Sequence, residues 1–204
     1  MQKVTIIDYG MGNLKSVEKA VEKAGAKPCV AKSPENILSS DKVILPGVGA
    51  FRDCINNLKK HNFDKAIYEF IKTGKFILGI CLGMHVMFEK SFEFGEYEGL
   101  SLIKGNVIKF GNIGNLPVPH MGWNMINIKK NTKLFKNITD KTFFYFAHSY
   151  YVNPVNSSDI MTTTDYGVEF VSSINKDNIF GVQFHPEKSQ DEGINILKNF
   201  IKEL

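Results

Sequence analysis

Short apolar runs alternate along the first half of the chain with segments whose apolar residues recur every three or four positions. The mainly apolar runs lie at 4–7, 42–45 and 76–80. The segments with helical spacing lie at 13–24, 51–58 and 63–71. Runs of four or five residues suit buried strands, and the longer periodic segments suit helices. This alternation predicts right-handed βαβ crossovers and a mostly parallel sheet covered by helices on both faces.

Three further elements complete the first half. A second strand is predicted at 27–31. "SPEN" at 33–36 has a serine before a proline, which is typical of a capped helix start. Another helix is predicted at 82–89, directly after the strand at 76–80.

The second half changes to strands joined by turns, which favours antiparallel or mixed pairing. These strands are predicted at 107–110, 124–128, 142–146, 160–164, 169–174 and 179–183. A last helix is predicted at 191–202. Because no linker, repeat or low-complexity tract interrupts the pattern, residues 1–204 predict a single α/β domain.

Composition narrows the class of protein. Hydrophobic residues make up 43% and charged residues 23%, as in ordinary globular domains, and the net charge is only +4. Basic residues are scattered in pairs, which argues against nucleic-acid binding. The three cysteines form no metal pattern and cannot all pair, and the N-terminal run resembles no signal peptide. We therefore expect a cytoplasmic protein without a membrane span, metal, flavin or nucleotide cofactor.

The stretch "GICLGM" at 79–84 places Cys81 between glycines where a strand ends and a helix begins. That context predicts a nucleophile elbow with cysteine in place of serine. Glycines allow the helix to pass close to the sheet, and the helix N-terminus favours thiolate. The N–H of Leu82 is placed to stabilise an oxyanion. The alternative for Cys81 alone is a small residue buried between strand and helix.

"GVQFHPEKS" at 181–189 supplies His185 and Glu187 immediately after a predicted strand. In an extended segment, residues two apart project to the same side. Glu187 can then hold the imidazole while its other nitrogen faces the thiol, as in acyl transfer. Alone, this pair is more often structural; together with a cysteine elbow it favours catalysis.

The turn in "LPGVGAF" at 45–51 follows another buried strand, so its tip is expected at the same sheet edge as Cys81. Glycines at this tip allow a peptide plane to turn an N–H toward an oxyanion. An ordinary strand-to-helix turn is the alternative.

Taken together, these motifs resemble the class I (triad) glutamine amidotransferases, and most closely the amidotransferase subunits of imidazole glycerol phosphate synthases. The resemblance rests on "DYGMGNLKSV" (8–17), "LPGVGAF" (45–51), "GICLGM" (79–84), "GLSLIKGNV" (99–107), "PHMGWN" (119–124), "FAHSYY" (146–151) and "GVQFHPEKS" (181–189). It covers nearly the whole chain. It implies a flavodoxin-like fold with an antiparallel β extension.

The resemblance also implies roles for individual residues. Cys81 attacks the side-chain amide of glutamine, and His185, oriented by Glu187, moves the proton. Glutamate and ammonia leave through a thioester. The N–H groups of Val48 and Leu82 form the oxyanion hole. Further implied substrate contacts are Gly47, Gly49, His85, Glu93, Glu96, Ser149 and Tyr150.

A partner is implied in the same way. Ammonia passes through a channel to a separate (β/α)₈-barrel synthase, which makes imidazole glycerol phosphate and an aminoimidazole carboxamide ribotide in histidine biosynthesis. Residues of a heterodimer interface or channel entrance would be Asn13, Trp123, Tyr150 and Lys188. Trp123 could instead fill a core gap, and Lys188 could be a solvated charge.

Two departures from the family pattern keep alternatives open. The family carries glutamine four residues after the nucleophile, where this chain has His85, and the usual acidic stretch is altered around Glu93 and Glu96. A paralogue that supplies ammonia for acetamidino-sugar formation in surface-polysaccharide synthesis remains possible. A stand-alone cysteine hydrolase and a silent regulatory subunit are further alternatives, although hydrolases of this type tend to place histidine directly after the cysteine.

Overall fold

A large mixed sheet organises residues 2–204, which are those that the computed structural model describes. Its main path, in spatial order, is β2 (Lys27–Ala31), β1 (Lys3–Ile7), β3 (Lys42–Leu45), β4 (Ile77–Ile80), β14 (Ile179–Val182), β13 (Glu169–Lys176), β11 (Tyr150–Pro154), β7 (Ile103–Lys109), β5 (Phe88–Ser91) and β6 (Tyr97–Glu98). The first five strands are parallel and follow the 2-1-3-4-5 order of doubly wound flavodoxin-like sheets. The predicted α/β fold class is confirmed.

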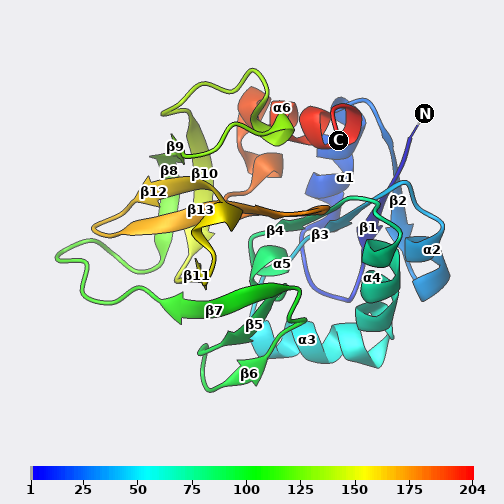
Figure 1. Ribbon diagram of the computed structural model, residues 1–204, viewed down its shortest axis with the longest axis horizontal. Coiled ribbons are helices and arrows are strands. Elements are labelled where there is room, and N and C mark those ends of the chain that lie inside the picture. Colours follow the sequence, from blue (N-terminus) through cyan, green and yellow to red (C-terminus); the bar gives the residue numbers. More distant parts are fainter. Residues whose placement is uncertain (1) are drawn as a thin grey trace.

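The strands after the parallel half extend the sheet with mainly antiparallel pairs, as expected (Figure 1). Two strands lie off the main path: β12 (Ile160–Asp165) pairs with β13 and with β9 (Asn127–Ile128). A separate two-stranded sheet joins β8 (His120–Met125) to β10 (Phe143–His148). Short 3₁₀ turns are found at η1 (Lys133–Phe135), η2 (Ser157–Asp159) and η3 (Pro186–Lys188).

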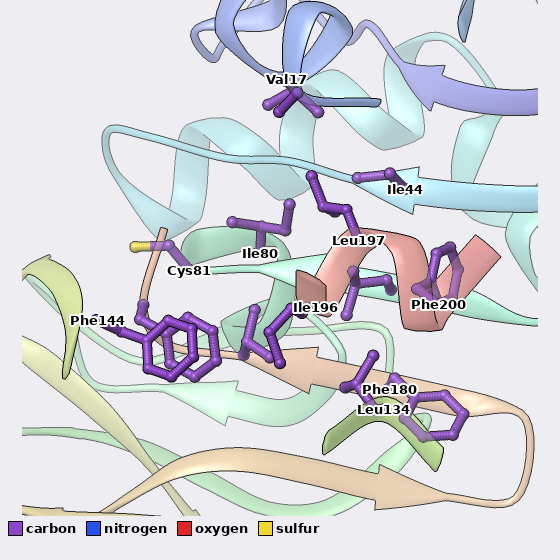
Figure 2. Packing of buried hydrophobic residues seen from close by; sticks show 14 of the residues in the cluster. Val17, Ile44, Ile80, Cys81, Leu134, Phe144, Phe180, Ile196, Leu197 and Phe200 are labelled. Carbon is purple, nitrogen blue, oxygen red and sulfur yellow. The ribbon is translucent and has the colours of Figure 1, made fainter. Parts of the chain in front are cut away.

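Helices cover both faces of the parallel strands (Figure 1). They are α1 (Leu14–Lys23), α2 (Pro34–Leu38), α3 (Phe51–Lys60), α4 (Phe63–Lys72), α5 (Leu82–His85) and α6 (Gln190–Lys202). On one face, side chains of α1 and α6 such as Val17 and Leu197 pack on Ile44 and Ile80 (Figure 2). On the other face, α2, α3 and α4 pack on residues such as Val43. These layers hold the ends of the parallel strands in place.

The helix predicted at 82–89 was wrong in length. It ends at His85, and the chain has turned into strand β5 by Phe88. Strands β5, β6 and β11 were not predicted. A continuous apolar run such as "LGMHVMF" fits a buried helix and a buried strand equally well by periodicity. The strand predicted at 124–128 was also wrong, because residues 124–125 end β8 and residues 127–128 form β9 in the other sheet. The remaining predicted elements are present with shifts of a few residues at their ends.

The glycine after the elbow is required by close backbone packing. A Cβ atom at Gly83 would lie 1.8 Å from the carbonyl oxygen of Leu45 on β3, and one at Gly79 would lie 2.7 Å from backbone atoms of α5. These contacts confirm the prediction that the glycines let the helix pass close to the sheet.

Gly83→Ala is therefore expected to lower the free energy of unfolding by about 3 kcal/mol, because a backbone carbonyl inside a buried strand cannot move aside. Denaturant unfolding measures this loss. Gly111→Ala is the matched control, since a Cβ there would meet nothing within 4 Å, and its effect is expected to stay within about 0.5 kcal/mol. Equal effects of the two substitutions would contradict the packing argument.

Candidate active site

Three strand ends meet at one edge of the sheet and enclose a cavity of about 430 Å³. Val48 and Gly49 follow β3, Cys81 follows β4, and His185 lies beyond β14, and all four line the cavity. The parallel pairing of β3, β4 and β14 brings these ends together, although they are far apart in sequence. The volume suits a small-molecule substrate.

Cys81 has the backbone conformation of a nucleophile elbow. Its φ is 52° and its ψ is −111°, a region that L residues rarely adopt and that is typically kept at functional sites. The N–H of Cys81 donates to Val182 O at 2.8 Å, and its carbonyl accepts from the N–H groups of Met84 and His85. Figure 2 shows the sulfur of Cys81 pointing away from the packed core residue Ile80. The predicted elbow is confirmed.

His185 and Glu187 form a buried pair beside the cavity. The Nδ1 atom of His185 is 2.8 Å from Oε1 of Glu187, and only 3% and 4% of their side chains are exposed. The predicted extended geometry was wrong, because Pro186–Lys188 forms a 3₁₀ turn. This turn still brings the carboxylate to the imidazole. The backbone N–H of His185 donates to Tyr145 O at 2.8 Å.

The electrostatics of this pair favour a charged imidazole. Burial lowers the pKa of His185, but its interactions with Cys81 and then with Glu187 outweigh burial and raise that pKa to about 10. Because Glu187 takes Nδ1, the other ring nitrogen is left for Cys81. The arrangement thus holds a proton between a sulfur and an imidazole, as nucleophilic acyl transfer requires.

The two backbone groups predicted to form an oxyanion hole belong to residues that line the cavity, Val48 and Leu82. Leu82 is the first residue of α5, and N–H groups in a first turn have no acceptor inside their helix. Gly49 has a φ of +96°, which shapes the turn after β3. Gly47, a predicted substrate contact, does not line the cavity. The turn that contains it is fixed by the Tyr9 hydroxyl, which donates to Pro46 O at 2.9 Å.

Comparison with known proteins agrees with this geometry. The family model described as glutamine amidotransferase class-I matches residues 5–204. The chain belongs to the class I glutamine amidotransferases. It is 49% identical to the imidazole glycerol phosphate synthase subunit HisH of Geobacter sulfurreducens, over 98% of each chain. It is 47% identical to the protein of the same name from Methanosarcina mazei, over 99% of each chain. The resemblance inferred from the motifs is confirmed.

The fold also agrees with a solved structure. PurLQS from Thermotoga maritima matches with a TM-score of 0.76 at 16% identity, covering 100% of this chain and 99% of that chain. At this identity the likeness concerns the fold alone.

The residues predicted to contact substrate divide into two groups. His85, Glu93, Ser149 and Tyr150 line the cavity. Glu93 accepts a hydrogen bond from the N–H of Phe51 at 2.6 Å, and burial raises its pKa. Glu96 lies outside the lining, where its carboxylate pairs with Lys90 at 2.8 Å. Of the two acidic candidates, the structure therefore brings only Glu93 to the amidotransferase site.

The residues predicted to face a partner also lie in different places. Lys188 lines the cavity, with its Nζ 5.6 Å from the centre of the Tyr145 ring. Trp123 is 46% exposed on β8, which excludes the alternative of a core filler. Asn13 caps α1, where its side chain accepts from the N–H of Ser16 at 3.4 Å.

The structure adds cavity or near-cavity residues that the motifs did not single out. Phe94, Pro119, Met121 and His148 line the cavity, and Gln183 lies fully buried behind Cys81. One signal could have found Gln183: it is a polar residue inside the apolar run 179–184. His148 stands in the quoted motif "FAHSYY" beside two predicted contacts.

Two kinds of feature are absent from residues 2–204, the described part of the chain. There, no group of three or more histidine, cysteine or acidic side chains is arranged to hold a metal ion. Within the same residues, none of the helices is long and apolar enough to cross a membrane.

Proposed function

We propose that this chain is the glutamine-hydrolysing subunit of imidazole glycerol phosphate synthase, and that it supplies ammonia for histidine biosynthesis in the cytoplasm. The observation that carries the proposal is the pair of His185 and Glu187, joined at 2.8 Å, beside an elbow cysteine in a cavity of suitable size. The full-length similarity to proteins named as HisH subunits supports the pathway.

In the first half-reaction, the Cys81 sulfur attacks the side-chain carbonyl carbon of glutamine. The carbonyl oxygen takes up the electron pair and is stabilised by the N–H groups of Val48 and Leu82. His185 then gives its proton to the amide nitrogen as the C–N bond breaks. Ammonia leaves, and the glutamyl group stays on the sulfur as a thioester.

In the second half-reaction, His185 takes a proton from water, which attacks the thioester carbonyl. Collapse of this intermediate breaks the C–S bond, and glutamate and the free cysteine are restored. Glu187 keeps the imidazole oriented and stabilises its charged form in both halves.

Glu93, Ser149 and Tyr150 are proposed to hold the α-amino acid end of glutamine. One carboxylate oxygen of Glu93 is already held by Phe51, so the other is free to accept from the α-ammonium group. Ser149 and Tyr150 face the same cavity from the start of β11 and offer donors for the α-carboxylate.

A partner surface is proposed on the exposed side of β8. Met121, Trp123 and Met125 alternate with less exposed residues and are 63%, 46% and 41% exposed. Met121 also lines the cavity, so this apolar surface begins at the mouth of the site. Side chains of this kind are typical of a protein interface. The partner that we propose is a (β/α)₈-barrel synthase, with ammonia passing near Lys188 and Tyr150.

Co-expression with candidate barrel synthases tests the function. Each purified complex is assayed with glutamine and with either acceptor of ammonia: the phosphorylated ribulosyl aminoimidazole carboxamide of the histidine pathway, or a sugar on which ammonia forms an acetamidino group. We expect glutamine-dependent formation of imidazole glycerol phosphate. In the active complex, a glutamine-mimicking electrophile is expected to modify Cys81.

Other products would redirect the proposal. An amidinated sugar as the only product would assign the chain to surface-polysaccharide synthesis. The amidotransferase mechanism would be overturned if the chain cleaved peptides at a rate that free glutamine does not change, and if the electrophile did not modify Cys81.

A further inference from the structure

A chain of three buried side chains ends at the reacting sulfur. The Nε2 atom of His85 is 2.7 Å from Oε1 of Gln183, and Nε2 of Gln183 donates to Sγ of Cys81 at 3.7 Å. Gln183 is fully buried and His85 is 6% exposed. This contact approaches Cys81 separately from His185 and Glu187, and neither half-reaction of glutamine hydrolysis uses it.

The main chain holds the members of this chain in place. The N–H of Gln183 donates to Ser172 O at 2.9 Å, and the N–H of Cys81 donates to Val182 O at 2.8 Å. His85 lies one helical turn after Cys81 and donates its own N–H to the Cys81 carbonyl. The side chains therefore start from backbone positions that cannot shift independently.

The chemistry of the groups gives the chain a direction. Burial lowers the pKa of His85 to about 4, so the ring is neutral near pH 7 and carries one proton. An amide oxygen can only accept, so that proton lies on Nε2 and is donated to Gln183. The amide then has to turn its NH₂ group toward Cys81. Reversing the amide would place its oxygen against the sulfur, and would require His85 to carry its proton on Nδ1 instead of Nε2.

We propose that Gln183 stabilises the thiolate of Cys81 by donating an amide hydrogen bond, and that His85 is a positioning residue that fixes the direction of this amide. A hydrogen bond to the charged form of a group favours that form. His85 thus acts through Gln183 rather than by holding glutamine. The inference rests on Cys81 being the nucleophile of the proposed function.

Other titratable groups also face Cys81 and must stay unchanged in any test. They are His185 with Glu187 behind it, Tyr9 from the loop after β1, and Glu93, His148, Tyr150 and Lys188 around the cavity. Replacing only His85 or Gln183 leaves all of these groups in place.

The test is the alkylation of Cys81 by iodoacetamide in the full-length protein. The Cys81 peptide is followed by mass spectrometry between pH 5.5 and 9.5, which separates it from Cys29 and Cys54. Gln183→Met keeps the size of the side chain and removes the donor. We expect alkylation about tenfold slower than in the parent at pH 7 and within twofold of it at pH 9.5, because a high pH favours the reactive thiolate of any cysteine.

Variants of His85 test the direction of the amide. His85→Leu removes the donor to Gln183, and we expect a loss of about threefold or more at pH 7. His85→Gln offers an amide N–H in its place, and we expect it to restore most of the parent rate. Adding His85→Leu to Gln183→Met is expected to cause no further loss, because His85 acts only through the amide.

Several results would overturn the proposal. One is an unchanged pH profile in folded Gln183→Met, with folding checked by thermal unfolding. Another is an equal loss at every pH, which indicates general disruption. A third is a His85→Leu variant with unchanged alkylation but a raised KM for glutamine, which would assign His85 to the substrate. If Gln183→Met does not fold, the two His85 variants still decide.

The same data separate this proposal from the proposed function. If alkylation depends on Gln183 but the purified complex does not hydrolyse glutamine, the role of Gln183 is kept and the proposed function is refuted. If glutamine hydrolysis is normal but the alkylation profile does not change when Gln183 is replaced, the proposed function is kept and the role of Gln183 is refuted.

Discussion

Cys81→Ala is expected to lower glutamine-dependent synthesis by the complex about 10⁴-fold or more, while synthesis from added ammonium salt continues. The reason is that no thioester forms without the sulfur, whereas ammonia supplied from solution bypasses this subunit's chemistry. Alanine fits the elbow site without a clash, because the side chain only loses its sulfur. Steady-state assays of the purified complex with each nitrogen source measure the two rates.

Cys29→Ala is the matched control for this experiment. Cys29 is a half-buried cysteine on β2, the outer strand of the parallel half of the sheet, and it does not line the cavity. Its replacement is expected to leave both rates within about twofold of the parent. If Cys81→Ala kept glutamine-dependent synthesis, the nucleophile would have to be sought elsewhere. Loss of both rates in an intact complex would indicate a structural role for Cys81.

The parallel half of the fold could be read from the sequence because its signals are local. Runs such as 42–45 and 76–80 are short, apolar and followed by helical spacing, and each became a strand. The segment after the elbow was misread, because its apolar run has no period that separates helix from strand. Its strand β5 is fixed by pairing with β7 and β6, which the local pattern does not contain.

The site was predictable to the extent that topology alone assembles it. Parallel strands place their carboxyl ends at one edge, so the turn at 45–51 and the elbow at Cys81 were expected to meet. The strand before the His-Pro-Glu motif was predicted only within the antiparallel or mixed half, and its parallel pairing with β4 brings His185 to the same edge. The contact between His85 and Gln183 could not be predicted in this way. It joins side chains 98 residues apart, and it depends on rotamers and on the short length of α5.

Glu187→Gln is expected to lower the kcat of glutamine hydrolysis by about 10³-fold with little change in KM. The substitution keeps the size of the side chain but removes its charge. In this variant, the side-chain NH₂ introduced at position 187 would donate to Nδ1 of His185. The ring proton would then lie on Nε2, the nitrogen that faces Cys81, so the ring could no longer take a proton there. KM should change little, because Glu187 does not line the cavity.

Glu98→Gln serves as the control, because Glu98 is an exposed carboxylate on β6. The kcat of this variant is expected to match that of the parent. Glutaminase assays of both variants in the complex measure the difference. A rise in KM with an unchanged kcat in Glu187→Gln would contradict the orienting role and indicate that Glu187 contacts substrate instead.

The loss of stability caused by Glu187→Gln should depend on pH, and the pKa of His185 determines the direction of this dependence. In the folded parent this pKa is raised to about 10, against 6.5 for an ordinary histidine. Its contribution to stability is therefore fully present below about pH 6.5 and is lost as the pH rises through 10. Glu187→Gln removes part of the upward shift. The free energies of unfolding of parent and variant, measured with denaturant, should differ most near pH 6.5 and converge toward pH 10. A difference that stays constant across this range would mean that Glu187 contributes packing rather than charge.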